Sequence, residues 1–267
     1  MGQRILFLGT GGDAYVIGKQ YRSSGGIILN INTTQIHIDP GPGSLMMAKM
    51  ASVNLRENTV LMVSQSTMAA ANDVNAVASA MTHEGLDKRG VLVCPSSVVE
   101  GNNAHLTEKY KNFLEKTIAI DNTKRIGIND VEIEVVEINN DASNVAGYKI
   151  FNQQFTITYI PDTGYDENLI KKISDTDILI LNVPYPSSHK EKGHMNAEDA
   201  HEIIREVKPQ LAIITGFGVK MVQADPLYEA REIQRATGVQ VIAAKDGMTI
   251  NPLSFAATTR QRNLQSF

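Results

Sequence analysis

Short apolar runs separated by turn residues dominate the first forty positions of the chain. Three of them, residues 4–8, 26–32 and 35–38, have the length and β-branched content of strands, and Asn32-Thr33-Thr34 predicts a hairpin turn between the last two. Helices and strands then alternate, with a helix predicted at 44–50, a strand at 59–63, a helix at 70–81 and a strand at 90–94.

The middle of the chain is richer in strands, and the second half returns to alternation. Four strand-like runs are separated by Asn, Asp and Gly turns, at 124–128, 131–138, 146–151 and 154–160. They are followed by a helix at 166–173, a strand at 178–182, a helix at 197–207, a strand at 211–215, a helix at 226–237 and a strand at 239–242. Two β-rich blocks with helices around them predict a four-layer αββα sandwich. No linker rich in Pro, Gly or Ser interrupts the sequence, so we expect one domain over residues 1–267.

Composition restricts the classes of partner. A chain of 267 residues buries enough surface to fold without disulfides, and its single cysteine, Cys94, lies in an apolar run typical of a buried strand. The net charge of −4 indicates no excess of positive charge for contacts with phosphate groups, so we expect no strong non-specific nucleic-acid binding. The sequence has neither an apolar stretch of about 18 residues nor a signal-peptide pattern, so we expect a cytoplasmic protein without membrane contact.

One motif indicates a dinucleotide-binding domain as a rival. Gly9-Thr10-Gly11-Gly12-Asp13-Ala14 satisfies the Gly-x-Gly-x-x-Ala pattern after a strand. That motif requires a helix to start at once, so that its amide groups hold the pyrophosphate. Residues 15–26 are rich in Gly and Ser and the next strands form a predicted hairpin, so we disfavour this alternative.

A series of short motifs carries a different resemblance. The chain opens with an apolar strand and a Gly-rich turn at 5–12, and later contains Asp39-Pro40-Gly41-Pro42-Gly43, Ile160-Pro161-Asp162-Thr163-Gly164, Gly193-His194-Met195-Asn196, Thr215-Gly216-Phe217-Gly218 and Asp246-Gly247-Met248. In this order and spacing they resemble the ribonuclease Z-like branch of the metallo-β-lactamase superfamily. The resemblance implies the αββα fold and a hydrolytic centre that holds two metal ions.

The loop that supplies most of those metal ligands is degenerate here. The family pattern is Ser-His-x-His-x-Asp-His after a strand, whereas the matching positions hold Gln65, Thr67, Ala69 and Ala70. The mid-chain metal histidine would fall at Asn139 or Asn140, and the last one at Gly216. None of these side chains is an imidazole or a carboxylate, so the resemblance is to a hydrolase with a degenerate metal site.

Asp162 is the one ligand of the family pattern that still maps onto this chain. A single carboxylate does not fix a transition metal, so we expect no metal cofactor. Alternatively, Asp39, Asp73 or Asp141 approaches Asp162 and forms an oxygen-lined site for one Mg or Ca ion, with one Zn ion a further alternative. In the third interpretation Asp162 is a turn carboxylate that accepts hydrogen bonds from neighbouring amides.

His194 has two interpretations. The matching histidine of the ribonuclease Z-like enzymes assists the leaving group and contacts the scissile phosphate. Alternatively, His194 merely precedes the helix that Asn196 caps. The other five histidines have no ligand-spaced neighbour, and we expect them to be solvated or hydrogen-bonded: His37, His83, His105, His189 and His201.

Two functional classes follow. The first is a non-catalytic binding, sensing or partner protein, with a cleft for a small anionic or polar ligand lined by Gln65, Ser66, Thr67, Asn139, Asp162, His194 and Gly216. The second is a residual phosphodiester or ester hydrolase that uses one metal or none, with His194 as general acid or base. A nucleophilic role for Ser64, Ser66 or Thr67 has little support, because no His–acid pair is linked to them in the sequence.

Residues 94–114, beside the expected cleft, are relevant to contacts between subunits. The apolar residues among them recur at near-helical spacing and are Val98, Val99, Leu106, Tyr110, Phe113 and Leu114. They either pack on their own domain or contribute to a subunit contact, and we predict a homodimer.

Overall fold

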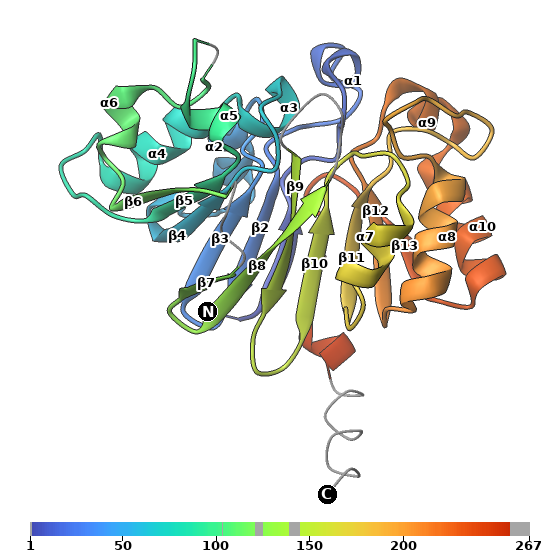
Figure 1. The fold of residues 1–267 in the computed structure, drawn as a ribbon. Helices are drawn as coiled ribbons and strands as arrows, with labels where there is room; N and C mark the ends of the chain where they lie inside the picture. Colours follow the sequence, from blue (N-terminus) through green and yellow to red (C-terminus); the bar gives the residue numbers. More distant parts are fainter. Residues whose placement is uncertain (1, 103, 121–124, 139–144, 257–267) are drawn as a thin grey trace, which may run out of the picture.

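Two sheets face each other, and helices cover their outer faces (Figure 1). The computed structural model describes residues 2–102, 104–120, 125–138 and 145–256. One sheet has the strand order β14-β1-β2-β3-β4-β5-β6 and the other the order β13-β12-β11-β10-β9-β8-β7. The predicted αββα sandwich is therefore confirmed.

The first sheet is built from the N-terminal half and one late strand: β1 (Arg4–Phe7), β2 (Ile27–Ile31), β3 (Thr34–Ile38), β4 (Asn58–Met62), β5 (Val91–Cys94), β6 (Lys116–Ala119) and β14 (Thr249–Ile250). β2 and β3 form the predicted hairpin, in which Asn32 takes a positive φ of 49°. β1 pairs antiparallel with β2, and the helix between them, α1 (Ala14–Gly18), has five residues. This arrangement differs from the parallel strand–helix–strand unit of a dinucleotide site.

The second sheet is antiparallel in one half and parallel in the other. Its strands are β7 (Arg125–Ile128), β8 (Val131–Ile138), β9 (Val145–Phe151), β10 (Thr156–Ile160), β11 (Ile178–Asn182), β12 (Leu211–Thr215) and β13 (Val241–Ala243). β7 to β10 pair antiparallel, and β10 to β13 pair parallel. The parallel strands β10, β11 and β12 therefore end at the same edge of the sheet, which is the edge that forms the site described below.

The helices flank the two sheets (Figure 1). Those that follow strands of the first sheet are α2 (Ser44–Met50), a 3₁₀ turn (Leu55–Glu57), α3 (Met68–Ala71), α4 (Val74–Thr82), α5 (Ser96–Val99) and α6 (Glu108–Lys111). Those of the second half are α7 (Glu167–Lys172), α8 (Ala197–Val207), α9 (Val219–Ala224) and α10 (Pro226–Thr237). Asn196 and Asp199 form a reciprocal capping box at the start of α8. Within the described residues, no helix is long and apolar enough to span a bilayer.

The helix predicted over residues 70–81 is in fact two helices, α3 and α4. The interruption falls at Asn72-Asp73, where the Asp73 amide donates to the carbonyl of Pro40 at 2.9 Å. The Asp73 carboxylate accepts from the amide of Ser44 at 2.9 Å, so it caps the N-terminus of α2. A contact with a distant loop thus overrides local helix propensity. The strands β6 and β14 and the short helices α1, α5, α6 and α9 were also not predicted.

Three apolar clusters fill the spaces between the four layers. The central cluster lies between the sheets, and the other two lie between each sheet and its helices. Four of the residues considered for a subunit contact, Val98, Val99, Leu106 and Leu114, are buried in the cluster under α4, as is Cys94. Packing on their own domain therefore accounts for these residues, and the homodimer stays a prediction.

Tyr148 on β9 connects the two sheets through a buried hydrogen bond. Its hydroxyl group donates to the carbonyl of Val63 at 2.5 Å, and it lies 3.3 Å from the carbonyl of Val93 on β5. The Tyr148 side chain is fully buried, and burial raises the pKa of its hydroxyl well above 10, so the hydroxyl stays protonated as a donor.

We predict that Tyr148→Phe lowers the free energy of unfolding by about 1–2 kcal/mol, because it removes this hydrogen bond and leaves a buried carbonyl with one partner fewer. Urea denaturation followed by circular dichroism measures the change. Tyr228→Phe is the matched control, because Tyr228 on α10 is 57% exposed. Equal midpoints for the two variants would contradict the role assigned to Tyr148.

Candidate functional site

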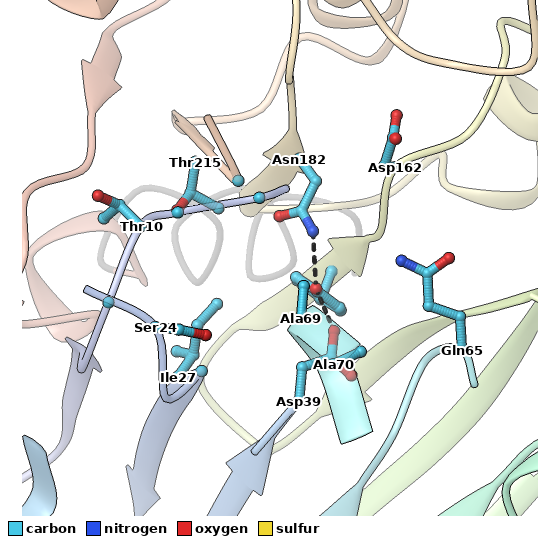
Figure 2. Close-up of a pocket in the computed structure, with 16 residues that line it drawn as sticks. Thr10, Ser24, Ile27, Asp39, Gln65, Ala69, Ala70, Asp162, Asn182 and Thr215 are labelled. Atoms are coloured by element: carbon cyan, nitrogen blue, oxygen red, sulfur yellow. Dashed lines mark hydrogen bonds between the residues drawn. The ribbon is translucent and has the colours of Figure 1, made fainter. Parts of the chain in front are cut away.

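A pocket lies where strand ends of both sheets meet (Figure 2). The N-terminal half contributes Gly9, Thr10, Gly11, Gly12, Ser24, Gly26, Ile27, Asp39, Gln65, Ala69 and Ala70, and the second sheet contributes Tyr159, Asp162, Asn182, Thr215 and Gly216. The space free for small groups is about 50 Å³, enough for a few waters or one functional group of a larger ligand.

The wall of the pocket depends on close backbone contact between the two halves of the chain. Gly11 and Phe217 form a parallel bridge, in which the Gly12 amide donates to the Phe217 carbonyl at 3.0 Å. A Cβ atom at Gly12 would lie 2.0 Å from the carbonyl oxygen of Gly216, so only glycine fits there. Asp246 accepts from the hydroxyl of Thr10 at 2.7 Å and from the amide of Ser23 at 2.7 Å, and it thereby fixes this Gly-rich loop.

Asp39 at the end of β3 is the most heavily hydrogen-bonded group of the pocket. The amide and the hydroxyl of Ser64 each donate to its carboxylate at 2.7 Å, and the hydroxyl of Tyr159 on β10 also donates to it. Burial raises the pKa of Asp39 to about 6, although the hydrogen bonds from Tyr159 and Ser64 act in the opposite direction. One carboxylate therefore joins the two sheets at the pocket.

Asn182 at the end of β11 extends this chain of hydrogen bonds. Its side-chain amide donates to the hydroxyl of Tyr159 at 3.0 Å. This bond is the dashed line that starts at Asn182 in Figure 2. A Cβ atom at Gly216 would lie 2.6 Å from Cγ of Asn182. The Asn182 side chain therefore occupies the space beside Gly216 into which a larger residue at that position would have to extend.

Asp162 lines the pocket, but its carboxylate points away from Asp39 and Asn182 (Figure 2). The imidazole Nδ1 of His194 lies 2.5 Å from one carboxylate oxygen, and the amide of Met195 donates to the other at 3.0 Å. Burial raises the pKa of Asp162, while the hydrogen bonds from His194 and Met195 act in the opposite direction. The hydrogen bonds to Asp162 thus come from the segment before α8 and not from its own turn.

The remaining residues predicted for the cleft are distributed differently. Gln65 and Gly216 line the pocket. Ser66 does not: its hydroxyl lies 3.0 Å from Nδ1 of His105 and donates to the carbonyl of Ser97 at 3.2 Å. Thr67 is exposed at the start of α3, and Asn139 lies outside the described residues, as do Asn140 and Asp141. The sequence reasoning missed Tyr159 and Asn182.

The other histidines have structural surroundings. His37 is fully buried on β3, where its Nε2 donates to the carbonyl of Gly25 at 2.7 Å, and burial lowers its pKa to about 4. His83 ends α4 in a left-handed conformation, and His201 lies 3.2 Å from the carboxylate of Glu202. Among the described residues, no three His, Cys, Asp or Glu side chains converge as a metal site would require.

The donors around the pocket do not fit the two-metal centre of the resemblance. Two carboxylates are present, those of Asp39 and Asp162, and protein donors already hydrogen-bond to both. The other polar side chains carry neutral amides and hydroxyls and are Thr10, Ser24, Gln65, Tyr159, Asn182 and Thr215. Zinc and similar metals need three or more imidazole, thiolate or carboxylate ligands, which this set does not offer.

Comparison with known proteins gives related chains. A family described as "Beta-lactamase superfamily domain" matches residues 34–217. The uncharacterised protein MJ1374 of Methanocaldococcus jannaschii is 28% identical over 255 residues, which cover 94% of this chain and 95% of that protein. The metallo-β-lactamase fold protein YhfI of Bacillus subtilis superposes with a TM-score of 0.77 at 17% identity, covering 94% of this chain and 99% of YhfI. The short form of human tRNase Z superposes with a TM-score of 0.66 at 13% identity, covering 92% and 98%.

The raised pKa of Asp39 predicts a specific pH dependence of stability. The folded state binds the proton more tightly than the unfolded state, whose pKa is near 3.8. The contribution of Asp39 to stability is therefore full below pH 3.8 and is lost as the pH rises through 6. Asp39→Asn does not titrate, so its free energy of unfolding should rise relative to the parent by about 3 kcal/mol between pH 3.5 and 7.5.

Urea denaturation of both proteins at several pH values measures this difference. Other titrating groups, His37 among them, affect parent and variant alike and cancel. Asp175→Asn, at an exposed position, is the control for the exchange of a carboxylate for an amide. If the free energy of unfolding of Asp39→Asn, relative to the parent, stays constant or falls as the pH rises, the buried state assigned to this carboxylate is contradicted.

Proposed function

The chain belongs to the metallo-β-lactamase superfamily, and on that premise we propose that it is a non-catalytic member whose pocket binds a small polar ligand. Hydrolases share its fold, as the tRNase Z comparison illustrates. A hydrolase of this superfamily uses metal ions to lower the pKa of a water and to stabilise the charge of the displaced group.

The hydrogen-bond chain from Asn182 through Tyr159 to Asp39 is the observation that carries the proposal. It places neutral side-chain groups against a buried carboxylate, where a two-metal centre would place positive charge. The Asn182 side chain also fills the space beside Gly216, the position that matches the last metal histidine of the family. A histidine at position 216 would have to displace the Asn182 side chain, and its backbone would have to adopt the φ of 65° that Gly216 has.

Asp162 supports the same conclusion. A carboxylate that bridges metal ions must direct its oxygens toward them. Here one oxygen faces His194 at 2.5 Å and the other accepts from Met195 at 3.0 Å. These bonds offset part of the cost of burying Asp162, although burial still raises its pKa.

The chemistry of the lining defines the ligand class. The hydroxyls of Thr10 and Thr215 and the amide of Gln65 offer donors and acceptors without net charge. The free space of about 50 Å³ admits only one end of a ligand. The ligand we propose is therefore a small molecule that inserts a hydrogen-bonding group and keeps its remainder outside.

A residual hydrolase is the second candidate, favoured by the Asp162–His194 pair. A carboxylate that orients an imidazole is a common general acid or base arrangement, and the His194 side chain is 46% exposed and so open to a substrate. Asp39 and Asp162 line one pocket and could hold a hard cation such as Mg or Ca better than Zn. Such a cation would compete with the hydrogen bonds that both carboxylates already accept.

We predict that the purified protein contains no stoichiometric zinc, manganese or iron, and that chelators leave its melting temperature unchanged, because no metal-binding energy is coupled to folding. Elemental analysis and thermal denaturation with and without EDTA measure this. With bis(p-nitrophenyl) phosphate, turnover in the presence of added zinc, manganese or magnesium should equal the metal-only background.

His194→Gln separates the two candidates. If the protein turns over the phosphodiester and His194→Gln abolishes turnover, the hydrolase is correct and the non-catalytic proposal is wrong. His201→Gln, at a histidine of α8 that does not line the pocket, is the control for a general effect of losing an imidazole. Two metal ions per chain would also refute the proposal.

A further inference from the structure

A second cavity lies at the opposite end of the first sheet from the pocket. The pocket is formed by residues that follow β1, β3 and β4, whereas this cavity lies where β2 ends and where β3 and β4 begin. Its volume is about 300 Å³, at the lower end of the range for small-molecule sites. The lining is entirely polar and includes Asn30, Gln35, Glu57, Thr59 and Arg89.

Buried amide side chains from three neighbouring strands form a directed series of hydrogen bonds in the wall of this cavity. Arg4 on β1 can only donate, and its Nε donates to Oδ1 of Asn30 at 2.7 Å, which fixes the orientation of the Asn30 amide. Nδ2 of Asn30 then donates to Oε1 of Gln35 at 2.9 Å. Nε2 of Gln35 in turn donates to Oδ1 of Asn58 at 2.6 Å. The series ends at Nδ2 of Asn58, a fully buried donor that has no acceptor among the described residues, which is unfavourable.

The register between β3 and β4 shifts at the same place. Gln35 pairs with Asn58, and the next residue, Ile36, pairs with Val60. Thr59 is therefore an extra residue in β4, and it lines the cavity directly after the buried Asn58. Bulges are rare in parallel pairs, and they often lie next to functional sites, where they redirect a side chain. The irregular strand thus brings a hydroxyl group to the cavity at the cost of one regular pairing.

Two opposite charges line the same cavity without pairing with each other. Neither Glu57 nor Arg89 forms an ion pair with another described residue. Glu57 accepts from Nδ2 of Asn54 at 3.2 Å. The hydrogen bond from Arg56 lowers the pKa of Asp87, and the charge of Arg89 contributes less, so this acid already has a partner. A ligand with a single charge is attracted by one of the two lining groups and repelled by the other, whereas a zwitterion matches both.

We propose that this cavity is a second binding site, for a free α-amino acid bound as a zwitterion. Glu57 accepts from the ammonium group of the ligand, and Arg89 donates to its carboxylate. The series of amides behind the lining holds Asn30 and Gln35 in fixed orientations, so little side-chain order is lost on binding. The site goes beyond the proposed function, because none of its residues lines the pocket.

Thermal denaturation with each proteinogenic L-amino acid in turn, followed by isothermal titration calorimetry with the one that raises the melting temperature most, tests the site. We expect saturable binding of one molecule per chain. The N-acetyl derivative of that amino acid lacks the ammonium charge, and its C-terminal amide lacks the carboxylate. Each derivative should bind about tenfold more weakly, because it loses one charge-assisted hydrogen bond.

Variants assign the two charge contacts. Arg89→Gln should weaken binding of the amino acid about tenfold but leave the affinity for its C-terminal amide nearly unchanged, and Glu57→Gln should do the same with respect to the N-acetyl derivative. Arg231→Gln and Glu167→Gln, at exposed positions on α10 and α7, are the matched controls and should bind like the parent. The proposal is overturned if no amino acid binds, if both derivatives bind as tightly as the parent ligand, or if Arg89→Gln and Glu57→Gln leave the affinity unchanged.

Discussion

The buried carboxylate of Asp39 is the constraint on which the pocket depends. A carboxylate removed from water is costly unless donors surround it. Asp39 meets this requirement in part, with two bonds from Ser64, after β4, and one from Tyr159 on β10, while burial still raises its pKa to about 6. The donors come from different sheets, so compensation of a single charge also fixes how the two sheets meet. The floor of the pocket is a consequence of this arrangement.

The other features of the site follow from the space left around that carboxylate. Asn182 donates to Tyr159 and occupies the volume beside Gly216, and Gly12 packs against the backbone of Gly216. Direct contacts of Gly216 with Asn182 and with Gly12 thus close the pocket on these sides. In our account the family scaffold has been retained while its metal chemistry has been replaced by hydrogen bonds between side chains. His194 and Asp162 form a second polar pair beside this network.

The fold was largely predictable from sequence because the alternation of apolar and polar residues reflects burial directly. The four mid-chain strands β7 to β10 and the helices α8 and α10 were predicted close to their observed limits. The break between α3 and α4 was not, because it depends on Asp73 reaching Pro40 and Ser44 across the fold. Local propensity contains no information about such a contact.

The candidate site was predictable only in part, for a related reason. Asp162 and Gly216 were found through motifs, but Tyr159 looks like any core aromatic in an apolar strand. Asn182 carried a weak signal, since it is a polar residue that ends the apolar run 178–182. The contact between Asp162 and His194 joins residues 32 positions apart, and it depends on how β10 and the segment before α8 are placed.

A crystal structure of the protein grown with excess zinc, with anomalous data collected on both sides of the zinc edge, tests the central claim most directly. Our account predicts no zinc peak in the pocket, with Asn182 still bonded to Tyr159 and Asp162 still bonded to His194. A zinc peak within bonding distance of Asp162 or Asp39, with either of those hydrogen bonds broken, would contradict it.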